Sequence, residues 1–178
     1  MRTLATERLT LEPLVAGHAE GMFGGLSDVG LYESLMDRPP DSLEWLRERY
    51  QRLSTRQSTD GRERWWNWVL RLGGGELIGT VQATIRDQEA EIAYLVFRAY
   101  WGRGLGLEAV GEVIRELAGV GVMSIGACAD RENARSRRLL ERLGFEERTL
   151  PEWRREEGAD DVWYVLVPGE HRQRLAGG

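Results

Sequence analysis

Lysine is absent from this sequence, and each of the 24 positions counted as lysine or arginine is arginine. A Schiff base on lysine, a lysine general base and the phosphate-binding lysine of Walker-type nucleotide sites are therefore all excluded. Cysteine occurs once, at Cys128, so the chain can form no internal disulfide. We interpret Cys128 as an inert buried thiol, because the sequence offers no evident base to activate it.

Histidine is nearly as scarce, with His18 and His171 placed near opposite ends of the chain. Two such distant residues are a poor basis for a histidine-containing triad or a histidine-rich metal site, and we expect no metal. The Gly-x-Ser-x-Gly motif of many hydrolases is also missing. We therefore interpret His18 as a surface or packing residue.

No stretch approaches the roughly 20 apolar residues needed to cross a membrane, and the first residues lack the apolar segment of a signal peptide. The net charge of −5 argues against general binding to nucleic acid. We therefore expect a cytoplasmic protein that binds neither membranes nor nucleic acid. A length of 178 residues fits one domain, which we place at residues 1–168, followed by a tail at 169–178.

The pattern of apolar residues predicts how the chain is organised. Strands are expected at 8–14, 64–72, 76–85, 89–97, 122–129, 145–150 and 161–167. Helical spacing predicts helices at 18–26, at 43–53, after the glycines at 102–106, and at 133–143. Three closely spaced tryptophans, Trp65, Trp66 and Trp68, could line a ligand groove, but in a hairpin we favour a place in the core.

The segment Tyr100-Trp-Gly-Arg-Gly-Leu-Gly-Leu-Glu-Ala109 joins a predicted strand to a predicted helix. Its glycines leave several backbone N–H groups unshielded, and the positive end of the following helix adds to their field. Such a turn binds anions, most often a phosphate or pyrophosphate, and Arg103 adds a full positive charge. The same glycines could instead form nothing more than a tight turn.

The spacing Gly104-x-Gly106-x-x-Ala109 also satisfies the fingerprint of dinucleotide-binding domains, with Asp130 about 20 residues further on. Such domains usually open with this fingerprint. Here about a hundred residues and a predicted antiparallel meander precede it, which disfavours a dinucleotide site.

Four segments together resemble the GNAT acyltransferase family, in particular its RimJ/RimL-like branch, which acetylates the N-termini of ribosomal proteins. They are residues 6–14, residues 76–80, residues 91–96 with 101–109, and Asn133-x-x-Ser136 with Leu143-Gly-Phe145. They follow the family's order and span nearly the whole chain. Two positions depart from the wider family pattern. Trp101 stands where Gln or Arg is usual, as is common in this branch, and Leu140 replaces the tyrosine that often serves as general acid.

The resemblance implies an α+β (α/β) fold, the GNAT fold: a central, mixed but mostly antiparallel twisted sheet of six to seven strands, flanked by about four helices. Splayed parallel strands are expected to hold acetyl-CoA as co-substrate, with its pantetheine arm paired to the backbone of Leu95, Val96 and Phe97. The turn and the last helix are expected to add Trp101, Gly102, Arg103, Gly104, Leu105, Gly106, Asn133, Ser136 and Arg138. One of the arginines at 135, 138 and 142 could reach the 3′-phosphate, or all three could form a solvated face. Asn133 could also be only a helix cap.

The implied reaction is direct transfer of an acetyl group to a primary amine in a ternary complex, since no serine or cysteine has an obvious activating base. A backbone N–H of residues 95–97 would stabilise the oxyanion. Glu91 is the candidate base, acting through a water, unless it is simply a surface carboxylate, and Glu89 is a weaker candidate. Ser136 is the candidate acid for the leaving thiolate, with capping or packing as the alternative.

Three functions stay open at this point. They are acetylation of a protein N-terminus, acetylation of a small amine such as an antibiotic or polyamine, and a non-catalytic acyl-CoA-binding or regulatory role. We predict the first, with acetyl-CoA or CoA and the amine substrate as partners, and formation of a homodimer is left open. Residues 15–60 and the loop at Trp153 are expected to shape the acceptor groove.

Overall fold

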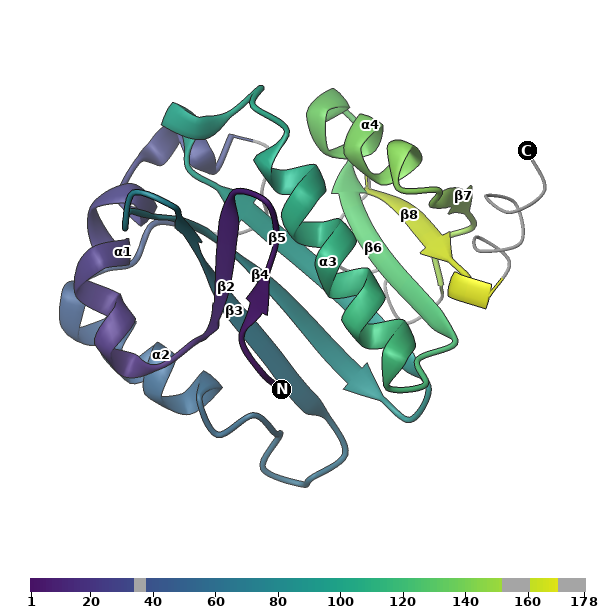
Figure 1. Cartoon of the computed structure of the whole chain (residues 1–178), viewed down its shortest axis with the longest axis horizontal. Helices are drawn as coiled ribbons and strands as arrows, with labels where there is room; N and C mark the ends of the chain where they lie inside the picture. The colour runs from purple at the N-terminus through teal and green to yellow at the C-terminus, as the bar shows by residue number, and fades with distance from the viewer. Residues whose placement is uncertain (34–37, 152–160, 170–178) are drawn as a thin grey trace.

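The computed structural model describes residues 1–33, 38–151 and 161–169, and Figure 1 shows the course of the chain. In these described residues eight strands form one sheet, in the order β1-β2-β3-β4-β5-β6-β8-β7. The strands are β1 (Leu4–Ala5), β2 (Leu9–Pro13), β3 (Arg64–Leu72), β4 (Leu77–Arg86), β5 (Glu89–Val96), β6 (Ser124–Asp130), β7 (Glu146–Arg148) and β8 (Asp161–Leu166). The α-helices are α1 (Ala19–Leu26), α2 (Leu43–Leu53), α3 (Leu105–Gly119) and α4 (Ala134–Arg142). The short 3₁₀ helices are η1 (Ala16–His18), η2 (Val29–Leu31) and η3 (Arg98–Tyr100).

Neighbouring strands of the sheet run antiparallel except β5 and β6, which are parallel. These two pair from Glu89 beside Ser124 to Ile92 beside Ala127, although β5 continues to Val96 and β6 continues beyond its paired residues. The strands separate past that point, which leaves an opening in the sheet beside the end of β5. The mixed sheet with splayed parallel strands that the resemblance implied is therefore confirmed.

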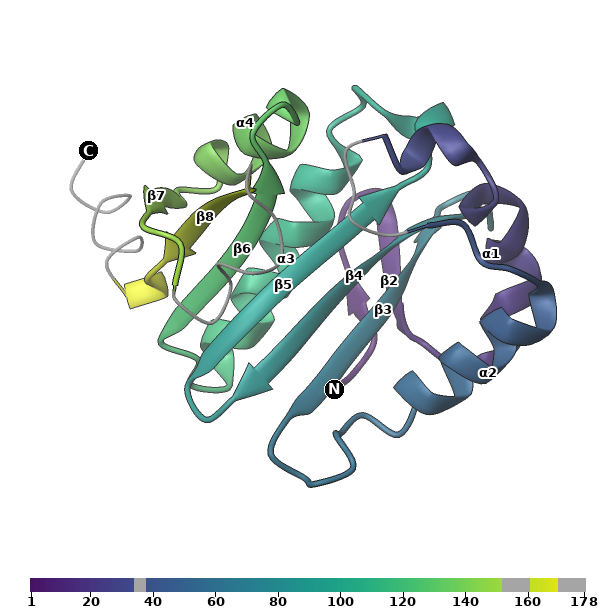
Figure 2. The ribbon, with the colours of Figure 1, turned by 180° about the vertical axis from the view of Figure 1, so that it is seen from behind.

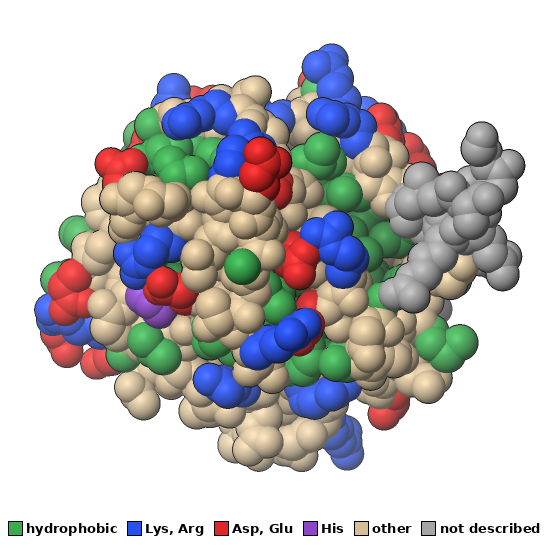
Figure 3. All heavy atoms as spheres, in the orientation of Figure 1, with side chains coloured by type: hydrophobic (Ala, Val, Ile, Leu, Met, Phe, Trp, Pro, Cys, Tyr) green, Lys and Arg blue, Asp and Glu red, His purple; other side chains and the backbone are tan. Residues whose placement is uncertain are grey.

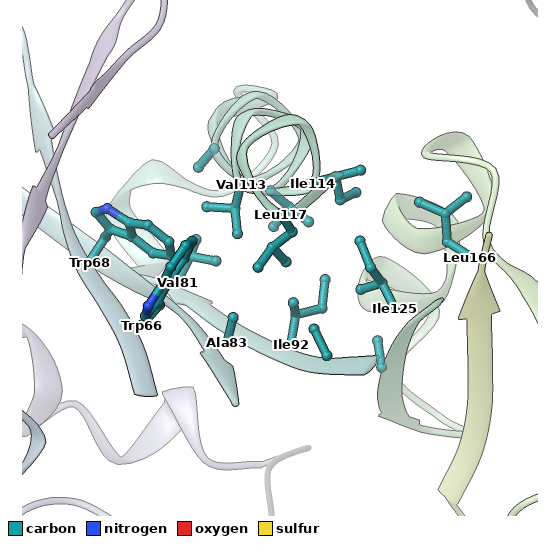
Figure 4. Close-up of a cluster of buried hydrophobic side chains, with 14 of the residues drawn as sticks. Trp66, Trp68, Val81, Ala83, Ile92, Val113, Ile114, Leu117, Ile125 and Leu166 are labelled. Carbon is teal, nitrogen blue, oxygen red and sulfur yellow. The ribbon is translucent and has the colours of Figure 1, made fainter. Parts of the chain in front are cut away.

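Helix α3 crosses one face of the sheet, with its apolar side against the strands (Figure 1). Figure 4 shows Val113, Ile114 and Leu117 of α3 pointing toward apolar side chains of the sheet. Trp66 and Trp68 belong to the same cluster, with ring centroids 5.9 Å apart in an edge-to-face arrangement, so the core prediction is confirmed for these two. It is wrong for Trp65, which is half-buried outside the cluster and donates its Nε1–H to Glu63. Each fully buried large apolar side chain contributes about 1.5–3 kcal/mol, so together they hold α3 firmly against the sheet.

Helices α1 and α2 pack at the β2–β4 end of the sheet, and Figures 1 and 2 show them from opposite sides. Leu46 and Tyr50 of α2 join Val69 and Phe97 in a second apolar cluster. Neighbouring residues of a strand point to opposite faces, so Val69 lies on the face away from Trp68 and α3. The sheet is thus covered on both faces by different helices.

Some observations differ from the predictions made from the sequence. Strand β1, which pairs with β2, was not predicted, because two residues are too few to show alternation. The dinucleotide-binding alternative is wrong, because the sheet is mainly antiparallel, and Asp130 instead accepts a hydrogen bond of 2.7 Å from Glu132 N–H in the turn before α4. The loop around Trp153 and the tail beyond Gly169 lie outside the described residues. Over the described ranges, none of the helices combines the length and the apolar character needed to cross a membrane.

Candidate active site

A cavity of about 650 Å³ opens where β5 and β6 separate, between the end of β5, the turn before α3 and the start of α4. Most residues for which the sequence predicted cofactor contacts line it. They are Leu95, Val96, Trp101, Gly102, Gly104, Leu105, Gly106, Asn133, Ser136 and Arg138. Three other predicted residues, Glu91, Phe97 and Arg103, lie outside this lining.

The glycine turn gives one end of the cavity its character. Gly102 and Gly104 adopt left-handed backbone conformations, with φ of 73° and 76°, in which any side chain would be strained. Gly104 is the N-cap of α3, so the first N–H groups of that helix have no partners within the helix. Together with the helix dipole they make this end of the cavity suited to an anion.

A hydrogen-bonded ion pair from the N-terminal hairpin fixes the first turn of α3. Glu108 accepts hydrogen bonds from the Thr6 hydroxyl, from Arg8 N–H at 2.9 Å and from Arg8 Nε at 2.7 Å. Arg8 Nη1 also donates to the carbonyl of Arg103 at 2.9 Å. Burial tends to raise the pKa of Glu108, but the bonds from Thr6 and Arg8 outweigh it and hold that pKa below its usual value. The charge of Glu108 is therefore balanced by Arg8, and it does not cancel the positive field of the turn.

Positive charge also lines the cavity from α4, where Arg135, Arg138 and Arg142 contribute to the wall. Among the ion pairs of the described residues, none involves these three arginines. The guanidinium of Arg135 lies over the Trp101 ring, with its Cζ 3.4 Å from the ring centroid. In Figure 3 arginine side chains gather along the upper edge of the molecule, over η3 and α4. This end of the cavity therefore favours a ligand with several negative charges.

The two edges of β5 differ at its end. Phe97 N–H donates to the carbonyl of Ile78 at 2.8 Å, and the Phe97 side chain lies in the second apolar cluster. Backbone groups alternate between the edges of an antiparallel pair, so Leu95 also bonds β4, whereas Tyr94 and Val96 direct their backbone groups toward the opening. The Val96 carbonyl accepts a hydrogen bond of 2.6 Å from Trp101 Nε1 there. The backbone of Phe97 is thus not brought to the cavity.

Comparison with known proteins identifies the kind of protein that has this cavity. A family model described as an acetyltransferase (GNAT) domain matches residues 8–146. The chain belongs to the GNAT acetyltransferase family. It is 30% identical over 154 residues to "uncharacterized N-acetyltransferase p20" of Bacillus licheniformis, with 84% of this chain and 85% of that protein covered. It is 26% identical over 178 residues to "uncharacterized N-acetyltransferase YoaA" of Bacillus subtilis (strain 168), with 94% and 98% covered.

A solved structure with the same fold is that of the microcin C7 self-immunity acetyltransferase MccE in complex with acetyl-CoA and AMP. It has a TM-score of 0.74 and 16% sequence identity, with 91% of this chain and 93% of that chain covered. GNAT acetyltransferases use acetyl-CoA, and the cavity of this one fits such a ligand on two counts. The α3 turn and the α4 arginines suit its phosphates, and the backbone edge at Tyr94 and Val96 suits an extended, amide-bearing arm.

In this acetyltransferase two hydroxyl groups meet in the cavity wall. The oxygens of Tyr94 and Ser136 lie 2.8 Å apart, and Asn133 Oδ1 accepts a hydrogen bond of 3.0 Å from Ser136 N–H, so Asn133 caps α4 and also lines the cavity. Burial raises the pKa of Tyr94 to about 12, although the hydrogen bond with Ser136 acts in the opposite direction. Tyr94 was not among the site residues predicted from the sequence. The available signal was strand alternation, which puts it on the same face as the buried Ile92.

A second cavity, of about 250 Å³, lies between α2 and the sheet. Tyr94 and Leu95 line both cavities, so the two meet at the end of β5. Ala93 also lines the second cavity, whereas Glu91, two residues earlier on β5, is half-buried and lies outside both linings. Glu89 is exposed at the beginning of β5. Neither carboxylate of this strand therefore lies where the two cavities of the acetyltransferase meet.

The other residues that were considered for catalysis or metal binding make structural contacts. His18 Nδ1 accepts a hydrogen bond of 3.1 Å from Val15 N–H, and its Nε2 lies 3.1 Å from a Glu12 carboxylate oxygen, which confirms a packing role. Cys128 is half-buried rather than buried, with its Sγ 3.3 Å from Asp161 Oδ2. Within the described part of this acetyltransferase, His, Cys, Asp and Glu side chains form no group of three or more that could hold a metal ion.

Proposed function

We propose that this GNAT acetyltransferase transfers the acetyl group of acetyl-CoA directly to the N-terminal amine of a protein, as its RimJ/RimL-like sequence features suggest. The observation that carries the proposal is the meeting of two cavities at Tyr94 and Leu95. A thioester held in the first cavity and an amine held in the second would come together at the end of β5. That arrangement supports direct transfer in a ternary complex, because holding both reactants in place removes the need for an acyl-enzyme.

Acetyl-CoA binding is assigned in this proposal to the turn, to α4 and to the edge of β5. The N–H groups of residues 103–106 bind the pyrophosphate, with Trp101 and Gly102 beside them. Arg138 binds the 3′-phosphate, and Arg135 and Arg142 add to the positive field. The pantetheine arm pairs with the open backbone edge at Tyr94 and Val96, next to Asn133, and Leu95 between them contributes only to the cavity lining. Phe97 is left out of this set, because its N–H already bonds Ile78.

The chemical step needs an oxyanion donor, an acid and a base. Val96 N–H is the proposed donor, because ladder alternation directs it toward the opening. Ser136 is the proposed acid for the leaving thiolate, supported by its position in the cavity wall and by the Tyr94 hydroxyl behind it. Glu91 is the proposed base. It lies outside both linings, about 7 Å along β5 from Ala93 of the second cavity, so it would accept the proton through water.

A small-molecule amine is the second candidate acceptor. The second cavity, at about 250 Å³, lies just below the range of about 300–1,000 Å³ that is usual for small-ligand sites. A volume of that size suits a compact amine, or the first residue of a peptide with the rest of the chain outside. The compact amine and the peptide would therefore fill the interior of the cavity in the same way. They differ at its mouth, through which only the peptide must extend.

The proposal is tested by measuring CoA thiol release from acetyl-CoA with a panel of N-terminal peptides and small amines. We expect release with peptides that carry an unblocked N-terminal amine, and loss of that release when the amine is blocked. Calorimetry with CoA and acetyl-CoA accompanies the assay. Binding of acetyl-CoA without release for any amine would overturn the proposed reaction, and absence of binding would overturn the assigned cavity as well.

A further inference from the structure

Two residues that line the second cavity carry buried polar groups without a hydrogen-bond partner among the described residues. Within the described residues, the hydroxyl of Tyr50 and Nδ2 of Asn67 make no hydrogen bond, not even with each other. Tyr50 is 3% exposed and Asn67 is 6% exposed, and both line the cavity. Buried polar groups are almost always paired in folded proteins, so two unpaired groups on residues that line one small cavity call for a reason.

The two groups belong to residues around the cavity in which the acceptor amine is proposed to bind. Tyr50 comes from α2 and Asn67 from β3, so they approach the cavity from the helix and from the sheet. The same cavity reaches Ala93 and Leu95 of β5, where it meets the first cavity. A molecule that fills it would thus lie against both residues and reach the reacting strand.

The two unpaired groups are hydrogen-bond donors, so they favour a ligand that offers an acceptor oxygen. An Asn amide nitrogen only donates hydrogen bonds, and a tyrosine hydroxyl can donate one. Burial raises the pKa of Tyr50 well above its usual value, so the hydroxyl keeps its proton and remains a donor. Arg38 and Arg49 also line the cavity, and the described part of the lining includes no Asp or Glu. A polyamine would bring more positive charge and no acceptor atom to such a site.

We propose that Tyr50 and Asn67 bind a carbonyl or carboxylate oxygen of the acceptor, so that the enzyme selects amines with such an oxygen close to the nitrogen. α-Amino acids and the first residue of a peptide belong to this class, whereas polyamines and simple alkylamines do not. The inference rests on the proposed acetyl transfer and narrows its acceptor. Tyr50 and Asn67 act here as specificity-determining residues, because they complete their hydrogen bonds only when the oxygen arrives.

The test compares Tyr50→Phe and Asn67→Leu with the wild-type protein on three acceptors. A short peptide offers an amide carbonyl, the corresponding free amino acid offers a carboxylate, and propylamine offers neither. The wild type should prefer one of the two oxygen-bearing acceptors over propylamine. Which of the two it prefers shows whether the enzyme acts on a peptide or on a free amino acid. Each variant should lower kcat/KM for that acceptor about tenfold and leave the value for propylamine unchanged.

Tyr32→Phe is the matched control. Tyr32 lines the same cavity, but its hydroxyl already donates to the carbonyl of Leu26 at 2.9 Å, so its loss should not change the ratio between acceptors. Equal losses for all three acceptors in Tyr50→Phe, or the same change of ratio in Tyr32→Phe, would overturn the inference. Wild-type preference for propylamine or for a polyamine would also overturn it.

Binding measured without turnover separates this inference from the proposed function. Calorimetry of the peptide and of the amino acid with the wild-type protein in the presence of CoA requires no acetyl transfer. Binding that weakens about tenfold in Tyr50→Phe and Asn67→Leu supports the inference even if no thiol is released. Binding of equal strength in wild type and variants refutes it, whatever the enzyme assay shows.

Discussion

Replacing Tyr50 by phenylalanine is expected to stabilise the protein in the absence of ligands, although Tyr50 is only 3% exposed and belongs to the second apolar cluster. A buried hydroxyl without a partner costs about 1–3 kcal/mol. Tyr50 lines an existing cavity, and the substitution removes a single oxygen atom, so it leaves little new empty space. Tyr50→Phe should therefore raise the free energy of unfolding by about 1–2 kcal/mol. For a domain of this length that raises Tm by about 2–8 °C.

Tyr32→Phe provides the comparison of opposite sign. The Tyr32 hydroxyl donates to the Leu26 carbonyl at the end of α1, and removing it leaves that carbonyl without this donor. The expected change is a loss of about 1 kcal/mol. The two substitutions delete the same atom from the same cavity lining, and the main difference between them is the pairing of the hydroxyl, although Tyr32 is also less buried than Tyr50.

Urea and thermal unfolding of the two variants and the wild type, followed by circular dichroism, measure this difference. If Tyr50→Phe is no more stable than the wild type, the hydroxyl has a partner in solution, such as a buried water, and the reasoning about an unpaired donor fails. Addition of an oxygen-bearing acceptor with CoA should change the difference in stability between Tyr50→Phe and the wild type. The ligand should stabilise the wild type more than the variant, because only the wild type gains a hydrogen bond to it.

Four further substitutions test the assigned roles. Ser136→Ala should lower kcat about 100-fold in the thiol-release assay with little change in KM for acetyl-CoA, and an unchanged kcat would remove Ser136 as the acid. Glu91→Gln should lower kcat at least about tenfold and flatten the rise in rate on the alkaline side, and unchanged kinetics would eliminate Glu91 as the base. Arg138→Gln should raise KM about tenfold for acetyl-CoA but not for its 3′-dephospho form, and equal effects on both would place the Arg138 contact elsewhere. Tyr94→Phe should reduce the loss of stability at high pH. The folded pKa of Tyr94, about 12, lies above its unfolded value of 10.0, so its contribution is present below pH 10 and is lost as pH rises toward about 12. Urea unfolding between these pH values measures that loss, and identical curves for variant and wild type would contradict the assignment.

The sheet, the helices and the glycine turn could be predicted from the sequence because each leaves a local pattern. Alternation marks β3 and β4, helical spacing marks α3, and the glycines at 102–106 mark a strand-to-helix turn. The Tyr94–Ser136 pair, in contrast, joins residues 42 positions apart, and the Arg8–Glu108 pair joins residues 100 positions apart. Neither pair has a characteristic spacing, because tertiary packing alone brings its members together.

The bonding of the Phe97 N–H and of the Tyr50 hydroxyl depends on which residues lie next to them in the fold. Phe97 was grouped with Leu95 and Val96, because the sequence does not say which edge of a strand a backbone N–H faces until the partner strand is known. Tyr50 lies at helical spacing from Leu46, so its inward direction follows from sequence. That its hydroxyl would lack a partner does not, since this depends on every residue around the cavity.

The missing family tyrosine is explained by where Leu140 lies. Leu140 is 0% exposed and packs in the main core, so in this chain position 140 serves packing and cannot present a hydroxyl to the cavity. The Tyr94–Ser136 pair brings two hydroxyls to the cavity wall from β5 and α4 instead. A serine alkoxide is far more basic than a phenolate, so a proton leaving Ser136 for the thiolate is best replaced at once from Tyr94. Even with its pKa raised to about 12, the tyrosine is the group of the pair that holds the negative charge more readily. In the proposed mechanism a tyrosine thus still carries the final negative charge. It is Tyr94 of β5 rather than a residue at position 140, and it acts through Ser136.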